Sequence, residues 1–179
     1  EGNRLIRQIK ENVSNLYSGT RDILWTLNPG SDRLSEIAGR LGSIGIEIFQ
    51  DTPIEFRFEK RLRSSDDLQL PASYGRNMLM IFKEAMNNSL KYSDASQISL
   101  TIEKAEEGEL NILLKDNGVG FDPVQAKRGH GTGNMFKRAK RIQSEFIIES
   151  RPQCGTACRL ITPLGPGGKG PGPACFGRF

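Results

Sequence analysis

Several features that would assign this sequence to a familiar class are missing. None of its apolar runs approaches the roughly 20 residues of a membrane span, and no charged-then-apolar signal peptide opens it. Its three cysteines are an odd number, and Cys154 and Cys158 have no nearby histidine or second cysteine pair. We therefore expect no disulfide framework, interpret both cysteines as packing residues rather than metal ligands, and favour a reducing cytoplasmic setting.

The charge is not of one sign either. The chain has 25 Lys and Arg against 21 Asp and Glu, a formal charge of +4, with basic clusters at 57–63 and 137–141. A solvated mixed surface explains this pattern, and an anionic small ligand is compatible with it. The basic residues lack interleaved aromatics and a recognisable nucleic-acid-reading module, so we expect no nucleic-acid partner.

The first 27 residues carry a heptad seam. Seam positions recur with alternating spacings of three and four residues, at Ile6, Ile9, Val13, Leu16, Thr20, Ile23 and Leu27. This spacing predicts a helix packed against other helices, either in a hairpin whose second helix is missing or in a dimer, and we favour the dimer; a helix lying on its own domain is the remaining alternative. Asn28-Pro29-Gly30 ends the seam, and a second helix is expected over 31–49, capped by Ser31 or Asp32.

The remaining elements are expected in the order strand, helix, two strands, helix, two strands. Their predicted bounds are 54–58, 71–93, 97–104, 109–115, a short helix containing Met135, Ala139 and Ile142, 146–149 and 157–161. This order predicts an α+β fold, a two-layer sandwich of a mixed sheet with helices on one face.

The long helix predicted over 71–93 carries a polar stripe. Glu84, Asn88 and Lys91 stand at i, i+4 and i+7, and the opposite side is apolar, with Met78, Ile81, Phe82, Ala85 and Met86. An amide oxygen can hold hydrated Mg²⁺, an ammonium can meet phosphate and a carboxylate can orient a nucleophile. A solvated helix face gives the same pattern, so the stripe alone does not define a site.

Two glycine-containing segments follow. The first is Asp116–Phe121, in which Asp116 stands at the end of a predicted strand and its carboxylate can accept a hydrogen bond from a base such as adenine. The glycines of this segment permit the backbone to approach a ligand closely. Gly129–Met135 is a glycine-rich loop running into a helix, which offers backbone N–H groups to phosphates. Its spacing matches neither the Gly-x-x-x-x-Gly-Lys-Ser/Thr loop nor the dinucleotide-binding fingerprint.

Together these segments resemble a known family. In order and spacing, Glu84–Lys91, Asp116–Phe121 and Gly129–Met135 resemble the three nucleotide-binding boxes of the ATPases that include histidine kinases, gyrase, Hsp90 and MutL. Residues 155–163 look like that family's last strand, and 21–29 are similar to the end of the dimerisation helices in DesK-, NarX- and LiaS-type sensor kinases. The resemblance implies the Bergerat-type ATP-binding domain of a two-component sensor histidine kinase.

The resemblance also implies ligands and roles, with ATP and Mg²⁺ as cofactors. Asn88 would hold the metal, and Glu84 would be the base or polarising carboxylate. Lys91 would contact phosphate, and Asp116 would select the adenine amine. The other nucleotide-binding positions it implies are Asn87, Gly118, Gly120 and, in a mobile lid over the phosphates, Gly129, His130, Gly131, Thr132, Gly133 and Asn134.

The chain departs from the family pattern at two histidine positions. Tyr92 stands where this subgroup often has histidine, and His130, the only histidine, lies in the predicted lid. We therefore expect the phosphoacceptor histidine to be absent from this chain. The resemblance implies γ-phosphoryl transfer to that histidine and then to an aspartate of a response regulator. It also implies a homodimer through the N-terminal helix, in the cytosolic part of a membrane-anchored sensor.

These inferences divide the chain into three parts. Residues 1–50 are expected to be the C-terminal part of the dimerisation region, 51–164 the ATP-binding domain, and 165–179 a flexible Gly/Pro-rich tail. Two alternatives remain open: an anti-sigma-factor type serine kinase of the same fold, and a non-catalytic nucleotide-responsive domain in which the helical seam mediates interaction.

Overall fold

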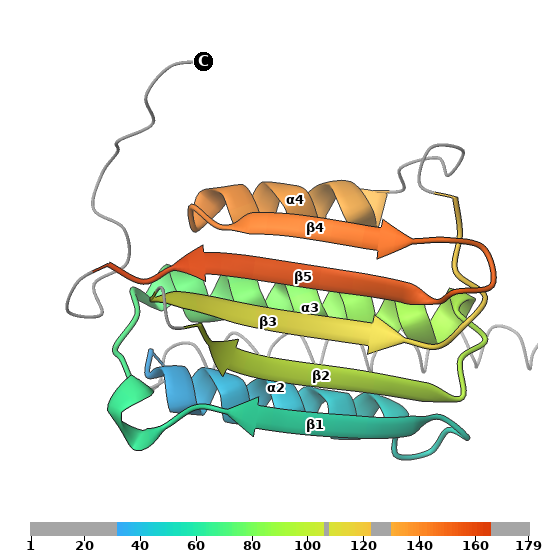
Figure 1. Cartoon of the computed structure of the whole chain (residues 1–179), viewed down its shortest axis with the longest axis horizontal. Coiled ribbons are helices and arrows are strands. Elements are labelled where there is room, and N and C mark those ends of the chain that lie inside the picture. The colour runs from blue at the N-terminus through green and yellow to red at the C-terminus, as the bar shows by residue number, and fades with distance from the viewer. Residues whose placement is uncertain (1–31, 106–107, 123–129, 166–179) are drawn as a thin grey trace, which may run out of the picture.

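The computed structural model describes residues 32–105, 108–122 and 130–165, and the predicted heptad helix lies outside them. Figure 1 shows the chain order. The helices and strands are α2 (Leu34–Phe49), β1 (Glu55–Arg61), the single 3-10 turn η1 (Ser64–Asp66), α3 (Ala72–Tyr92), β2 (Gln97–Lys104), β3 (Glu109–Asp116), α4 (His130–Arg141), β4 (Glu145–Ser150) and β5 (Thr156–Pro163).

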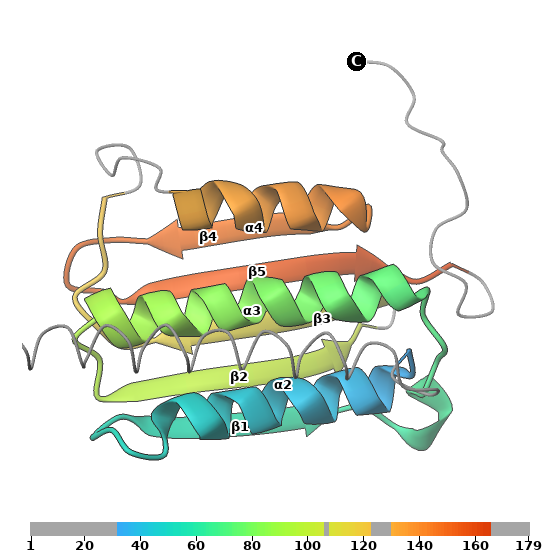
Figure 2. The same ribbon diagram turned by 180° about the vertical axis from the view of Figure 1, so that it is seen from behind.

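The five strands form one mixed sheet in the order β1-β2-β3-β5-β4. β1 and β2 are parallel, and the other neighbouring pairs are antiparallel. Figures 1 and 2 show α2, α3 and α4 together on one face of this sheet. The predicted two-layer α+β sandwich is confirmed, and each predicted strand and helix in the described part overlaps an observed one.

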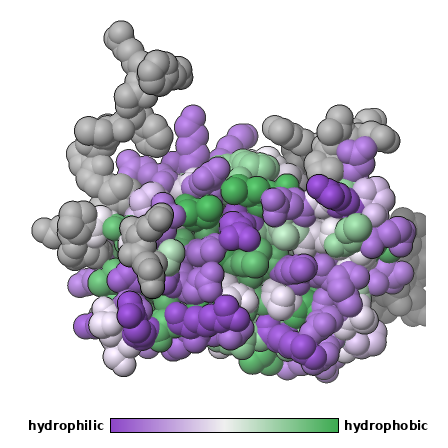
Figure 3. Space-filling model, in the orientation of Figure 1, coloured by the Kyte–Doolittle hydropathy of each residue, from purple (hydrophilic) through white to green (hydrophobic). Residues whose placement is uncertain are grey.

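Side chains alternate between the two faces of the sheet. Along β2, Ile98, Leu100 and Ile102 are fully buried under the helices, while the residues between them are half-buried on the other face. Figure 3 looks onto that other face, where hydrophilic residues surround apolar ones near the middle. The period of two that predicted strands therefore also identifies which side chains meet the helices.

Helix α3 crosses the middle of the sheet. Pro71 stands immediately before its first residue, Ala72, with its own ψ in the extended region. Proline suits a helix start because its φ is fixed near the helical value and because an N–H at that position would have no intrahelical acceptor. The apolar side predicted for this helix is confirmed, since all five of its residues are at most 2% exposed: Met78, Ile81, Phe82, Ala85 and Met86. The polar side of α3 therefore faces away from the sheet.

Helix α2 shares the core of the sheet. Leu34, Ile37 and Leu41 are at most 1% exposed and belong to the same apolar cluster as the β2 and α3 side chains. Gly42 and Gly45 bring the α2 backbone against the rings of Phe58 and Phe56 on β1. Residues 34–49 therefore pack with the sheet as part of one core.

The start of α2 is held from a distant segment. Arg33 occupies the N-cap without a side-chain cap, whereas Asp67 Oδ1 accepts the Ser35 N–H at 3.0 Å. Asp32, one of the two predicted caps, instead accepts a hydrogen bond from Gln69 Nε2 at 2.7 Å. That prediction was wrong because the acceptor comes from the segment after η1, which local spacing does not reveal.

Candidate functional site

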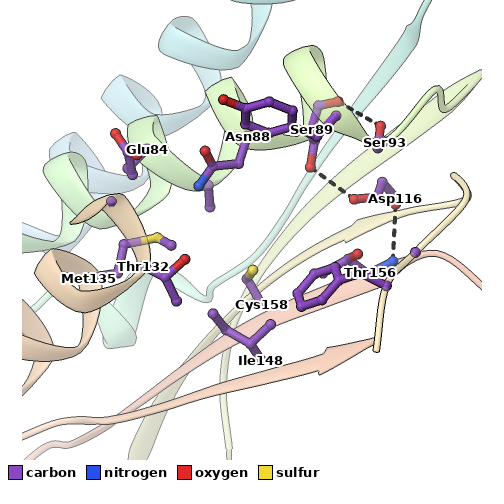
Figure 4. A pocket seen from close by; sticks show the side chains of 15 residues that line it. Glu84, Asn88, Ser89, Ser93, Asp116, Thr132, Met135, Ile148, Thr156 and Cys158 are labelled. Atoms are coloured by element: carbon purple, nitrogen blue, oxygen red, sulfur yellow. Dashed lines mark hydrogen bonds between the residues drawn. The ribbon is translucent and has the colours of Figure 1, made fainter. Parts of the chain in front are cut away.

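A single cavity of about 550 Å³ brings together segments that are far apart in sequence. Helix α3, the segment after β3, the first turn of α4 and the β4–β5 hairpin surround it, and Figure 4 shows it from close by. Its lining residues are Glu84, Ala85, Asn88, Ser89, Tyr92, Ser93, Asp116, Gly120, Phe121, Gly131, Thr132, Met135, Ile148, Thr156 and Cys158.

Asp116 is the buried polar centre at one end of the cavity. The residue is 3% exposed, and its Oδ1 accepts hydrogen bonds from the backbone N–H groups of Gly118 at 3.1 Å and Thr156 at 3.0 Å. Oδ2 accepts the Ser89 hydroxyl at 2.9 Å (Figure 4). Three donors from a turn, a strand and a helix therefore fix one carboxylate, whose remaining acceptor capacity is open to the pocket.

The turn after β3 is shaped by two glycines. A Cβ at Gly118 would lie 2.1 Å from the Ser93 carbonyl oxygen, and one at Gly120 would lie 2.1 Å from that of Arg151. Gly120 also has φ +58, in the left-handed region that favours glycine. Gly120 lines the cavity, whereas Gly118 supports the wall from behind, against the end of α3.

The other end of the cavity combines α3 with the start of α4. Glu84 and Asn88, one helical turn apart, are half-buried lining residues, as are Gly131 and Thr132 of the first α4 turn. The first N–H groups of a helix have no intrahelical acceptor and carry partial positive charge. This end therefore offers oxygen ligands and a helix N-terminus side by side, an arrangement suited to phosphate and its counter-cation.

Other predicted residues of α3 lie outside this cavity. Lys91 is exposed, and Asn87 donates its side-chain N–H to the Lys83 carbonyl at 2.9 Å; neither lines the pocket. Each helical residue turns by about 100°, so the pocket side passes through Asn88 and Ser89 while positions 87 and 91 fall beyond its edge. The predicted phosphate contact of Lys91 therefore has no support in this geometry.

The predicted lid is only partly included. Gly131 and Thr132 line the cavity, whereas Gly133 and the exposed Asn134 do not. His130 is the first residue of α4, and its side chain lies outside the described part of the structure. Gly129 precedes the described residues of this segment, so its role and the mobility of the lid stay predictions.

Sequence reasoning missed several lining residues. Ser89 and Ser93 continue the Ala85 side of α3, and their spacing of four could have indicated a common face. Thr156 reaches the cavity wall only because β5 pairs with β3, which is distant in sequence. Tyr92 and Phe121 line the cavity with 73% and 39% exposure, so they stand at its mouth.

The two described cysteines differ. Cys154 is exposed, so its predicted packing role was wrong, whereas Cys158 is buried in the cavity floor. Burial, and after it the charge of Asp116, raises the pKa of the Cys158 thiol to about 12, so it stays protonated and unreactive at neutral pH. Over the described ranges, no group of three or more His, Cys, Asp or Glu could hold a metal ion.

The fold and this cavity define a nucleotide-binding domain: a mixed sheet under helices, with a fixed carboxylate at one end of the pocket and a helix N-terminus at the other. The profile of the histidine kinase-, DNA gyrase B- and HSP90-like ATPases matches residues 75–166, just over half of the 179 residues. The chain belongs to this ATPase family, and the predicted family is confirmed.

Curated relatives are sensor proteins. The chain is 32% identical over 88 residues to the Haemophilus influenzae sensor protein NarQ homolog, covering 49% of this chain and 16% of that protein. It is 30% identical over 128 residues to Bacillus subtilis sensor histidine kinase YdfH, covering 70% and 30%. With Staphylococcus epidermidis sensor protein VraS it shares 24% identity over 163 residues, covering 90% and 45%. The chain thus spans less than half of each relative.

Solved structures support the fold. The histidine kinase domain of the Erythrobacter litoralis blue-light activated histidine kinase has a TM-score of 0.59 at 16% identity, covering 71% of this chain and 59% of that one. The catalytic domain of histidine kinase ThkA has a TM-score of 0.58 at 14% identity, covering 78% and 96%. In the part of the chain searched, no helix is long and apolar enough to cross a membrane.

Proposed function

We propose that this chain is the ATP-binding catalytic part of a two-component sensor histidine kinase. The observation that carries the proposal is one cavity with a buried acceptor, Asp116, at one end and Glu84, Asn88 and the α4 N-terminus at the other. A nucleoside triphosphate whose base carries an exocyclic amine has the matching polarity, with a hydrogen-bond donor on its base and negative charge on its phosphates. Membership of the ATPase family supports ATP as the nucleotide.

At the base end, the proposed contact is between Asp116 and the exocyclic amine of adenine. A carboxylate only accepts hydrogen bonds, and Oδ2 has one protein donor, so it has capacity for another. The apolar side chain of Ile148 lines the same cavity and offers a surface for a flat ring. A base with a carbonyl in place of the amine would present an acceptor to an acceptor.

At the phosphate end, we assign a Mg²⁺ site to Asn88 with Glu84 beside it. Mg²⁺ prefers oxygen ligands, keeps several waters and uses only one or two protein ligands when phosphates supply the rest. The amide and carboxylate oxygens that line this end fit that demand without a larger acidic cluster. When bound, the metal would neutralise charge on the phosphates. The α4 N-terminus would contribute backbone N–H groups to the same oxygens.

The proposed reaction passes the γ-phosphoryl group to a histidine on dimerisation helices and then to an aspartate of a response regulator. Glu84, at the phosphate end, would polarise the acceptor imidazole or take its proton. Most of the acceleration would come from positioning and charge neutralisation. The whole protein would be a homodimer and a membrane-anchored sensor with this part in the cytosol. Because residues 34–49 pack with the sheet, we place the end of its dimerisation segment before Leu34.

A phosphotransfer assay tests this function. The chain would be mixed with γ-labelled ATP, Mg²⁺ and the histidine-bearing helix hairpin of the relative YdfH, with the catalytic part of YdfH as positive control. We expect label on the hairpin, none on a hairpin whose histidine is replaced by glutamine, and at least about 10²-fold slower transfer by Glu84→Gln. ATP binding without any labelled hairpin would contradict the kinase and favour a nucleotide-responsive interaction domain.

A further inference from the structure

Ser89 is a second polar side chain at the base end of the cavity. It lies on α3, whereas Asp116 ends β3, and the Ser89 Oγ to Asp116 Oδ2 distance is 2.9 Å. Both side chains line the cavity, and the two residues are 8% and 3% exposed. A hydrogen bond between two buried groups on different elements is well placed to control how the carboxylate is presented.

The direction of this hydrogen bond fixes what Ser89 can offer. A carboxylate cannot donate, so the one hydroxyl proton of Ser89 is committed to Asp116. The Ser89 oxygen is left with lone pairs only, next to Oδ2 on the same wall. The carboxylate cannot easily turn away, because its Oδ1 is held by the N–H groups of Gly118 and Thr156.

We propose that Ser89 is a specificity-determining and positioning residue for the purine base, an inference that rests on the proposed ATP site. Ser89 holds the Asp116 carboxylate in place and adds a second acceptor for the same exocyclic amine. An amine has two hydrogens and can meet two acceptors. A carbonyl oxygen at that position faces two lone-pair surfaces and is left unpaired, so 6-oxopurine nucleotides are rejected.

The test compares ATP with ITP, whose base carries an oxygen in place of the amine at purine C6 and a proton on the neighbouring N1. Calorimetric affinities with Mg²⁺ would be measured for the parent, Ser89→Ala, Ser89→Cys and Ser89→Thr. We expect both Ala and Cys variants to bind ATP about tenfold more weakly with little change for ITP, and Thr, which keeps a hydroxyl, to restore the preference. Ser43→Ala is the matched control, since Ser43 is an exposed helical serine bonded to the Gly39 carbonyl.

The outcomes separate this inference from the function on which it rests. A parent that prefers ATP, with the same ATP-to-ITP ratio in folded Ser89→Ala and Ser89→Cys, overturns the role of Ser89 alone. Equal weakening of both nucleotides also overturns it, because that is what a purely structural serine would give. A folded parent that binds neither nucleotide overturns the ATP site and this inference together. Thermal unfolding of each variant shows which of them are folded.

Discussion

The carboxylate of Glu84 lies directly over the backbone of Gly131: a Cβ added at residue 131 would be 2.1 Å from Glu84 Oε1. This contact joins α3 to the first turn of α4 at the phosphate end of the cavity. Gly131→Ala should therefore displace the end of the Glu84 side chain. We expect phosphotransfer to the hairpin to slow at least about tenfold, because small misplacements of a catalytic group are costly.

The matched control for this variant is Gly133→Ala, in the same helical turn but outside the cavity lining. In the described part of the structure, a Cβ at residue 133 would have no atom within 4 Å apart from those of its chain neighbours and its own helix backbone. Glu84 can yield at its flexible end, so both variants should stay within about 1 kcal/mol of the parent in free energy of unfolding. Equal transfer rates for the two variants, measured with saturating ATP, would show that the contact between Glu84 and Gly131 does not matter.

The packing of α2 on β1 gives a second prediction. A Cβ at Gly45 would lie 2.0 Å from the Phe56 ring, which is itself stacked on Phe49 with 5.4 Å between centroids. Gly45→Ala should lower the free energy of unfolding by about 2 kcal/mol, since overpacking outweighs the gain in helix propensity. Gly39 lies on the exposed side of the same helix, and among the described residues a Cβ there would meet nothing within 4 Å beyond its chain neighbours and its own helix backbone. Gly39→Ala should therefore raise the free energy of unfolding by up to about 1 kcal/mol.

Urea denaturation at fixed pH measures both glycine variants of α2. If Gly45→Ala is as stable as Gly39→Ala, α2 does not pack on β1, and a dimerisation region reaching residue 50 becomes the better description.

Asp66 links the η1 turn to β2 and predicts a pH dependence. The Arg63 backbone N–H, followed by the Lys104 ammonium 3.1 Å away, lowers the pKa of Asp66 from 3.8 to about 2. A pKa depressed in the folded state contributes stability above pH 3.8, and that contribution is lost as the pH falls through about 2. Asp66→Asn should therefore be less stable than the parent near pH 5 and approach it near pH 2.

Urea midpoints from about pH 5 to about pH 2 would follow that difference. Asp51→Asn, at an exposed carboxylate after α2, serves as the comparison and should track the parent throughout. A constant gap between parent and Asp66→Asn at every pH would assign the effect to shape rather than to the charge of Asp66.

Much of the fold could be predicted from the sequence because its signals are local. The period of two in 97–104 and 109–115 predicted a hairpin of strands, and the apolar side of the 71–93 helix predicted which face meets the sheet. The place of α2 could not be read in the same way. An amphipathic helix needs a partner, but its pattern does not say whether that partner is a sheet or another subunit.

In the candidate site, too, some residues could be predicted from local sequence and others depend on long-range packing. Glu84, Asn88 and Asp116 could be singled out by residue type and order, and the cavity brings them together. The Ser89 hydrogen bond to Asp116 and the entry of Thr156 depend on how α3 and β5 pack beside β3, which spacing within one segment does not encode. Lys91 shows the converse, because a stripe defined only by i, i+4 and i+7 extended past the edge of the pocket.

Magnesium-dependent ATP binding by calorimetry tests the central claim most directly, comparing the parent with Asp116→Asn and Asn88→Ala. The account predicts that the parent binds and that both variants bind at least about tenfold more weakly, since each removes a contact with a charged or metal-bound group. Only the Asn88→Ala loss should shrink when magnesium is withheld. A folded parent that binds no ATP, or two variants that bind like the parent, would contradict the nucleotide site.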